Sequence, residues 1–268
     1  MPGDRSDPRD TFSHSAVRYL SSTDHQSGPD LEMIRQIASQ RFPSLTVDVA
    51  TGAGHALRAA CPFSGSCAAL DLTIEMLQVA REHLTGAELA NVRFIQSTAD
   101  QLPLPEGTVS LLTCRIAPHH FQSVPRFLDE VVRVLEPEGQ CVIIDTISPE
   151  ESESDQFINE VEQQRDPSHI RSHTHKQWLG FFEMAGLETI SVVFFERNHP
   201  FREWAARTGL DEDGIKSLEI RFQTASPDIR EKFNVQLDAE GRVSSYTDEK
   251  GIFVLKKGER LKDKGERN

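Results

Sequence analysis

Apolar and polar residues alternate with two different periods between residues 30 and 150. Short, largely apolar runs predict strands at residues 45–49, 67–70, 92–95, 109–114 and 141–145. Between these runs, apolar residues recur every three to four positions, which predicts amphipathic helices at residues 31–41, after Gly54, at 74–84 and at 124–135. Strands that alternate with helices favour a parallel sheet with helices on both faces, so we predict an α/β fold.

The pattern changes after residue 150. The acidic run at 150–155 fits either the start of a helix or a solvated surface, and we favour the surface. A helix through Trp178 is predicted to end at Gly186, and the runs that follow predict a strand at 190–195, a mostly helical stretch, a hairpin at 235–243 and a last strand at 252–255. Residues 1–28 predict a flexible N-terminal segment, and residues 258–268 a charged tail.

The formal net charge of -13 limits the kinds of partner. A surface with this charge would repel nucleic acid phosphates and anionic lipid headgroups, so we expect no nucleic acid partner and favour a small molecule. No apolar run approaches the roughly 18 residues of a membrane span, and the N-terminus lacks the apolar stretch of a secretory signal. We therefore predict a cytoplasmic protein without a membrane span.

The cysteines are Cys61, Cys67, Cys114 and Cys141. They show no C-x-x-C spacing, and Cys114 and Cys141 lie within apolar, strand-like runs. Both features are typical of buried thiols, so we predict that all of them are reduced.

The stretch VDVATGAGHAL at residues 47–57 reads as a strand, a glycine turn and the start of a helix. Such a turn lets a ligand approach the backbone and the positive end of a helix, as in dinucleotide sites. The spacing does not fit the G-x-G-x-x-G/A fingerprint, because the third small position falls on Leu57 when counted from Gly52 and on His55 when counted from Ala50. We therefore expect a ligand other than a dinucleotide.

A carboxylate follows the second predicted strand. Asp71 is placed to accept hydrogen bonds from the two hydroxyls of a ribose, although it could also cap the helix that begins near Thr73. The polar loop at 96–103 could meet the edge of a purine, and Leu72 and Met76 its face. Asp48, at the end of the first strand, would favour a cation. A ligand with a ribose, an adenine, a cationic end and no phosphate is S-adenosylmethionine.

Several segments in this order resemble the class I S-adenosylmethionine-dependent methyltransferases, in particular the ubiquinone/menaquinone-biosynthesis branch (methyltransferase type 11). They are VDVATGAGH at 47–55, ALDLTIEMLQVA at 69–80, NVRFIQSTADQLPLP at 91–105, LLTCRIAPHHF at 111–121 and FLDEVVRVLEPEGQCVIIDT at 127–146. The resemblance implies a Rossmann-like, seven-stranded sheet, mostly parallel, whose last two strands are an antiparallel pair, with a helical insert or lid. It also implies methyl transfer that leaves S-adenosylhomocysteine as product.

The resemblance implies cofactor contacts at ten positions. Asp48, Ala50, Gly52 and Gly54 would form the turn at the methionine end, Asp71 would bind the ribose, and the residues near the adenine would be Leu72, Met76, Ala99 and Asp100. The backbone around Arg115 would meet the methionine amine. Two positions depart from the family pattern, since Ala50 stands where many relatives have glycine and Thr98 where many have aspartate. Residues 29–150 would form the cofactor-binding core, and residues 151–257 would complete the sheet and carry the acceptor-site insert.

Candidates for the acceptor side lie in two segments. His119 and His120 follow the fourth strand, where a histidine can take the acceptor's proton, so we predict that they are catalytic. Arg165 and His169, in the segment RDPSH, are predicted to bind the acceptor. Aromatic residues of the late helical stretch would either line an apolar acceptor cavity or pack in a core; they are Phe201, Trp204 and Phe222.

Two other functions remain open. A metal-dependent enzyme would use the histidines, but their spacing is not that of a zinc site, so we predict no metal; the histidines are His119, His120, His169, His173 and His175. A protein that binds S-adenosylmethionine without transferring its methyl group is the second alternative. The acceptor atom, whether carbon, oxygen or nitrogen, and the oligomeric state stay open at this point.

Overall fold

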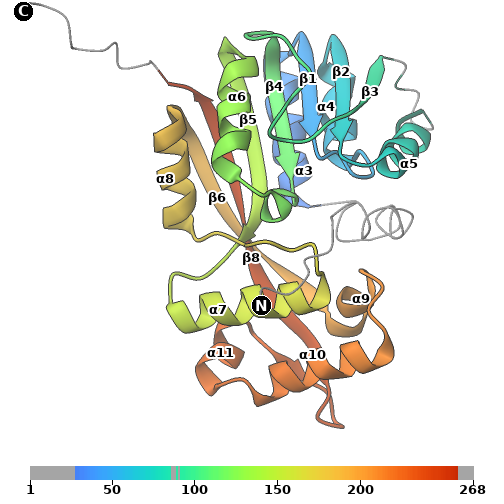
Figure 1. Ribbon diagram of the computed structural model, residues 1–268, viewed down its shortest axis with the longest axis vertical. Coiled ribbons are helices and arrows are strands. Elements are labelled where there is room, and N and C mark those ends of the chain that lie inside the picture. Colours follow the sequence, from blue (N-terminus) through green and yellow to red (C-terminus); the bar gives the residue numbers. More distant parts are fainter. Residues whose placement is uncertain (1–27, 86–88, 90, 259–268) are drawn as a thin grey trace, which may run out of the picture.

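The computed structural model describes residues 28–85, 89 and 91–258, and a single mixed sheet runs through it (Figure 1). The strands pair in the order β3-β2-β1-β4-β5-β8-β6, and the short β7 pairs with β8 beside this path. Neighbours from β3 to β5 are parallel, whereas β8 is antiparallel to both β5 and β6. The strands are β1 (Leu45–Val49), β2 (Ser66–Asp71), β3 (Val92–Gln96), β4 (Val109–Arg115), β5 (Leu135–Ile147), β6 (Leu187–Pro200), β7 (Gln236–Leu237) and β8 (Val243–Lys257). The predicted α/β sheet with an antiparallel last pair is confirmed.

Helices cover both faces of the sheet because successive side chains of a strand point to opposite faces. On one face lie α3 (Pro29–Arg41), α4 (His55–Ala60) and α5 (Ile74–Thr85), whose apolar residues pack on side chains such as Leu111 and Ala69. On the other face, α6 (Val124–Val134) and α8 (His175–Ala185) pack on side chains such as Val47 and Leu112. The result is a three-layer arrangement with β1 near its centre (Figure 1).

The strand order reverses at β1. The chain passes from β1 to β2 and β3 on one side and then returns to β4 on the other side. In sheets of this kind, ligands bind beyond the carboxyl ends of the strands at the point of reversal. The ends of β1, β2 and β4 are therefore the first place to search for a site.

A second, smaller core lies where β6 ends and β8 begins. It is built by α7 (Ser152–Arg165), α9 (Phe201–Ala206), α10 (Glu212–Thr224) and α11 (Pro227–Lys232), below the main sheet in Figure 1. Phe201, Trp204 and Phe222 are each at most 2% exposed and pack in this core, and Trp204 also lines a cavity beside it. The acidic run at 150–155 leads into α7, with Glu153 and Asp155 in its first turn, and residues 150–153 are exposed, so the run is both a helix start and a solvated surface.

The cysteine prediction is wrong in part. Cys61 and Cys67 form a disulfide with Cα atoms 6.2 Å apart, because the short helix η1 (Cys61–Phe63) returns the chain from α4 to the start of β2. Cys114 and Cys141 are free and buried, as predicted.

The predicted flexible segment at 1–28 and the tail at 258–268 lie outside the described residues except for Gly28 and Gly258. Among the helices that the structure describes, none combines the length and apolar character that a membrane crossing requires.

Candidate functional site

The turn after β1 has an unusual backbone. Ala50 (φ 53°), Gly52 (φ 53°) and Gly54 (φ 82°) all lie in the left-handed region, and the amide of Thr51 donates to the carbonyl of Leu70 on β2 at 2.9 Å. Glycine adopts this region without strain, whereas alanine does so at a cost. The glycine that many relatives carry at position 50 therefore has a conformational reason, and Ala50 keeps the same conformation.

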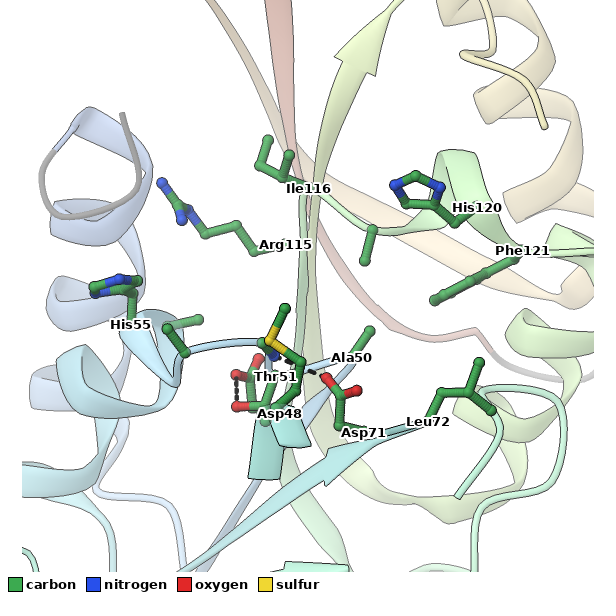
Figure 2. Close-up of a pocket in the computed structure, with 15 residues that line it drawn as sticks. Asp48, Ala50, Thr51, His55, Asp71, Leu72, Arg115, Ile116, His120 and Phe121 are labelled. Carbon is green, nitrogen blue, oxygen red and sulfur yellow. Dashed lines mark hydrogen bonds between the residues drawn. The ribbon is translucent and has the colours of Figure 1, made fainter. Parts of the chain in front are cut away.

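A cleft of about 900 Å³, including the part open to solvent, lies beyond the ends of β1, β2 and β4. Figure 2 shows its layout: Asp48, Thr51 and Asp71 lie at the base, with Arg115 and His55 on one side. Leu72 and Phe121 lie on the other side. Most of the predicted cofactor residues line this cleft, together with the predicted catalytic His120; they are Asp48, Ala50, Gly52, Asp71, Leu72, Met76 and Arg115.

Asp48 is a buried carboxylate held by two hydroxyls. Its Oδ1 accepts from Thr113 at 2.6 Å and its Oδ2 from Thr51 at 2.7 Å. Burial raises the pKa of Asp48 to about 6, even though these hydrogen bonds and the charge of Arg115 oppose the shift. An ionised carboxylate in such surroundings is stabilised by a cation placed close to it.

Asp71 is fixed in place by the turn that it faces. Its Oδ2 accepts from the amide of Gly52 at 2.9 Å, and its Oδ1 accepts from the amide and hydroxyl of Thr73 at 3.0 and 3.2 Å. Burial raises its pKa above the ordinary value, and hydrogen bonds from Thr73 and Gly52 oppose that rise. The two roles considered for Asp71 coexist, because it lines the cleft and also binds the start of α5.

Leu72, Met76 and Phe121 give the cleft an apolar part of its lining. The loop after β3 starts beside it, since the amide of Ser97 donates to the carbonyl of Asp71 at 2.9 Å. The buried hydroxyl of Ser97 has no hydrogen-bond partner among the described residues. Two predicted adenine neighbours lie outside the lining of the cleft: Ala99 packs against the main core, and Asp100 is exposed.

The two glycines of the turn have different surroundings. A Cβ added to Gly52 would meet no protein atom within 4 Å, so the cleft leaves open space against this backbone. A Cβ added to Gly54 would lie 3.1 Å from Cδ1 of Leu84, so this glycine allows α5 to pack closely and does not line the cleft. The open space at Gly52 fits a ligand that contacts the backbone.

Alanine at each glycine should separate these roles. Both variants are expected to lose about 1 kcal/mol or more of stability from the positive φ, and Gly54→Ala more because of Leu84. Only Gly52→Ala is expected to weaken S-adenosylhomocysteine binding, by about 10-fold or more, because its methyl group would stand in the cleft. Thermal unfolding and calorimetric titration measure the two effects; equal binding losses in the two variants would contradict this distinction.

A second cavity, of about 690 Å³ with its open part, adjoins the first. Arg115, Ile116 and His120 line both cavities, so the two share a wall. The predicted acceptor residues His119, His120, Arg165 and His169 all line this second cavity. The structure therefore brings together two segments that are far apart in the chain.

His119 is paired with a carboxylate that the sequence analysis did not single out. Its Nδ1 lies 2.5 Å from Oδ1 of Asp145, a fully buried residue of β5. Burial lowers the pKa of His119, but the charge of Asp145 and its hydrogen bond outweigh burial, so the pKa lies above its ordinary value. An aspartate at Nδ1 fixes the ring and its tautomer and leaves Nε2 to accept a proton.

The pKa values of His120 and His169 are shifted in the opposite direction to that of His119. Burial, followed by the charge of His119, lowers the pKa of His120 to about 4 and that of His169 to about 3. Nδ1 of His120 lies 3.1 Å from the carbonyl oxygen of Ser168, and Nε2 of His169 lies 3.1 Å from Oδ1 of Asn159. Both rings are therefore neutral near pH 7, whereas His119 titrates at a higher pH.

Charged residues that the sequence analysis missed complete the second cavity. Its lining includes Arg197 and His199 from β6, Arg207 after α9, and Asp248 and Lys250 from β8. Asp30, at the start of α3, accepts from Nε of Arg115 at 2.6 Å. No local motif marks these residues, because they come from strands and turns that only the fold brings together.

The described residues contain no group of three or more histidine, cysteine, aspartate and glutamate side chains arranged to hold a metal ion.

Arg165 is held by Glu162, whose Oε2 accepts from Nε and Nη2 of Arg165 at 3.0 and 2.7 Å. The guanidinium of Arg165 also lies 4.9 Å from the ring centre of Trp204.

Known proteins of similar sequence and structure support the assignment of a family. A family model described as a methyltransferase domain matches residues 47–143. The uncharacterized methyltransferase YcgJ of Bacillus subtilis is 32% identical over 88% of this chain and 93% of its own. A demethylmenaquinone methyltransferase of Listeria monocytogenes is 36% identical over a shorter stretch, 32% of this chain and 36% of its own.

Two solved structures superpose on this chain over nearly the whole of their own length. A Bacillus halodurans C-125 protein assigned as a methyltransferase superposes with a TM-score of 0.83 at 33% identity, over 87% of this chain and 100% of that one. The YcgJ structure superposes with a TM-score of 0.80 at 30% identity, over 86% and 98% of the two chains. These likenesses agree with the matching domain and with the cleft where the strand order reverses. The chain belongs to the S-adenosylmethionine-dependent methyltransferases.

Proposed function

We propose that S-adenosylmethionine binds in the first cleft and that a small-molecule acceptor binds in the second cavity, so that the methyl group passes across the shared wall. One observation carries this proposal: Arg115, Ile116 and His120 line both cavities. Methyl transfer is an in-line displacement, so the acceptor atom must lie directly beside the methyl group. Adjacent cavities of these sizes suit a cofactor and a small acceptor.

The described residues support a definite placement of the cofactor. Asp71 lies where it can accept from the ribose hydroxyls, and Leu72, Met76 and Phe121 offer an apolar surface to the adenine. The polar loop after β3, which starts beside Asp71, is our candidate for the contact at the adenine edge. Asp48 supplies negative charge for the cationic end, and Arg115 lies toward the second cavity.

His119 is our candidate for the base that removes the acceptor's proton. Bound S-adenosylmethionine supplies an electrophilic methyl group, and the protein's part is to position the acceptor and take up its proton. Asp145 holds His119 through Nδ1, so Nε2 can receive that proton and the resulting cation is stabilised by the carboxylate. His120, in the shared wall, is neutral and positions the acceptor.

Ile116 adds a feature of the backbone to the shared wall. Its φ is 52°, a conformation that is a genuine outlier for a β-branched residue and stores about 1–3 kcal/mol of strain. The amide of Ile116 donates to the carbonyl of Ile144 at 2.7 Å, which holds the strained residue in place. We infer that this conformation sets the separation of the two cavities.

The domain division, the location and the acceptor class belong to this proposal as well. We assign cofactor binding to residues 29–150 and most of the acceptor site to residues 151–257, in a cytoplasmic enzyme whose acceptor is not a nucleic acid. A protein that binds S-adenosylmethionine without transferring its methyl group is the alternative.

Incubation with S-adenosylmethionine carrying a labelled methyl group tests the proposal. Purified protein and a small-metabolite extract are expected to give a labelled small molecule together with S-adenosylhomocysteine. Tight cofactor binding without any labelled product, across extracts and across phenol, quinone, amine and acid panels, would favour the alternative.

A further inference from the structure

We propose that a hydroxyl group of the methyl acceptor binds in the second cavity between His169 and Ser172, donating a hydrogen bond to Nδ1 of His169 and accepting one from the hydroxyl of Ser172. We call these two residues the hydroxyl subsite. The inference rests on the proposed function, because it identifies a chemical group of the acceptor that is bound beside the cofactor.

Asn159, on α7, holds both members of the hydroxyl subsite through one oxygen. Its Oδ1 accepts from the amide of Ser172 at 2.7 Å and lies 3.1 Å from Nε2 of His169. The orientation of the Asn159 amide is fixed, because its Nδ2 donates to the carbonyl and to Oδ1 of Asp155 at 3.0 and 3.1 Å. An amide oxygen only accepts, so Nε2 of His169 carries the proton of their hydrogen bond.

Nδ1 of His169 is therefore the ring nitrogen with the lone pair. Burial first, and the charge of His119 second, lower the pKa of His169 to about 3, so the ring is neutral near pH 7 and Nδ1 carries no proton. Within the described part of the chain, the side chain of His169 makes a single hydrogen bond, to Asn159. Because His169 lines the second cavity, a ligand there meets a nitrogen that accepts a hydrogen bond and does not donate one.

Ser172 supplies the second, independent observation. It is 1% exposed and lines the same cavity, yet its hydroxyl has no hydrogen-bond partner among residues 28–85, 89 and 91–258. A buried hydroxyl without a partner costs stability, and a ligand that supplies the partner removes this cost.

A hydroxyl is the ligand group that suits both residues. It can donate to Nδ1 of His169 and accept from the hydroxyl of Ser172 at the same time. A carboxylate or a carbonyl has no proton to donate to His169, and an ammonium group has no lone pair to accept from Ser172. The chemistry of the pair therefore selects a hydroxyl.

The hydroxyl subsite lies close to the proposed reaction centre. The ring centres of His169 and His119 are 5.5 Å apart, and His119 is our candidate for the base. An acceptor with its proton facing His119 therefore carries the bound hydroxyl only a few bonds from the reacting atom. We expect the methylated product to retain this hydroxyl.

Replacing Ser172 with alanine in the full chain tests the inference. The KM for the acceptor that is identified by methyl labelling is expected to rise about 10-fold or more, with a smaller change in kcat. The unfolding temperature of the acceptor-free protein should equal or exceed that of the wild type, because the variant loses an unpartnered buried hydroxyl. Ser217→Ala is the matched control, because Ser217 is exposed on α10 and lies outside the cavity, so neither quantity should change.

Two variants of His169 separate ligand binding from support of Asn159. The amide of glutamine reaches the position of Nε2 and keeps the bond to Asn159, whereas the amide of asparagine reaches the position of Nδ1 and offers its oxygen to the ligand. His169→Gln is expected to raise the KM for the acceptor about 10-fold or more, and His169→Asn to raise it less. The reverse order would show that the ring serves Asn159 and would overturn the inference.

The remaining outcomes also decide. A labelled product without a hydroxyl overturns the inference and leaves the proposed function standing. An unchanged KM in Ser172→Ala overturns it too, because the hydroxyl then has no ligand to bind.

Absence of any labelled product would count against the proposed function instead. Catechol is then titrated by calorimetry into the protein saturated with S-adenosylhomocysteine, because it presents adjacent hydroxyls on a small rigid ring. We expect saturable binding that Ser172→Ala weakens about 10-fold or more. Failure of catechol to bind, or equal affinity in the two proteins, overturns the inference.

Discussion

Replacing His119 with alanine is expected to lower the turnover number by about 100-fold or more, the range over which general bases act. The physical reason is the pair with Asp145, which fixes the ring and raises its proton affinity. S-adenosylhomocysteine affinity should barely change, because His119 lines the second cavity and not the cofactor cleft. Steady-state kinetics with the acceptor identified by labelling, beside a cofactor titration, measure both quantities.

The pH dependence distinguishes His119 from its neighbour. A base must be deprotonated to act, so a rate that depends on His119 should rise with pH through a pKa above 6.5, the ordinary value of histidine. A rate that depends on His120 should instead rise near its pKa of about 4 and stay level above pH 6. Asp145→Asn removes the charge that raises the pKa of His119. The pH at which the rate rises should therefore shift lower, and the rate itself should fall.

Two results would count against His119 as the base. If His119→Ala keeps wild-type turnover, the acceptor needs no base or another group supplies it. If turnover stays but the acceptor binds more weakly, the histidine only orients the acceptor. His120→Ala is the matched variant, because the ring of His120 lies 4.2 Å from that of His119 but has a different partner.

Replacing Asp71 with alanine is expected to weaken S-adenosylmethionine binding by about 1.5–3 kcal/mol, the range for hydrogen bonds to a charged group. The structure adds a second expectation. The amides of Gly52 and Thr73 donate to Asp71, and the variant leaves both donors without this acceptor, so thermal stability should also fall. Calorimetric titration below the unfolding temperature separates the two effects.

Asp100→Ala is the control for this prediction. Asp100 was predicted from the family resemblance to contact the adenine, but it is exposed and lies outside the cleft lining. Its replacement should leave cofactor affinity within error of the wild type. Equal losses for Asp71→Ala and Asp100→Ala would mean that the loop after β3 moves onto the cofactor, and unchanged binding in a folded Asp71→Ala variant would remove Asp71 from the site.

Much of the cofactor cleft was predictable because its residues are close in sequence or follow strands. Asp48, Ala50 and Gly52 lie in one continuous turn, and Asp71 with Leu72 ends the next strand, so parallel pairing of β1 and β2 brings them together. The loop at 96–103 was harder to interpret, because a polar loop can present any of several side chains to a ligand. The family resemblance marks Asp100 in this loop, but Asp100 is exposed and lies outside the cleft lining.

The amino-acid sequence by itself determined the α/β class, the order of its strands along the chain and the kind of ligand, because periodicity and turn chemistry are local properties. Only the tertiary structure decided the chemistry of the second cavity. Asp145 reaches His119 from β5, and Lys250 and Arg197 arrive from the antiparallel strands β8 and β6. Burial and the charge of Asp145 set the pKa of His119, and this pairing cannot be read from two residues that lie far apart in the sequence.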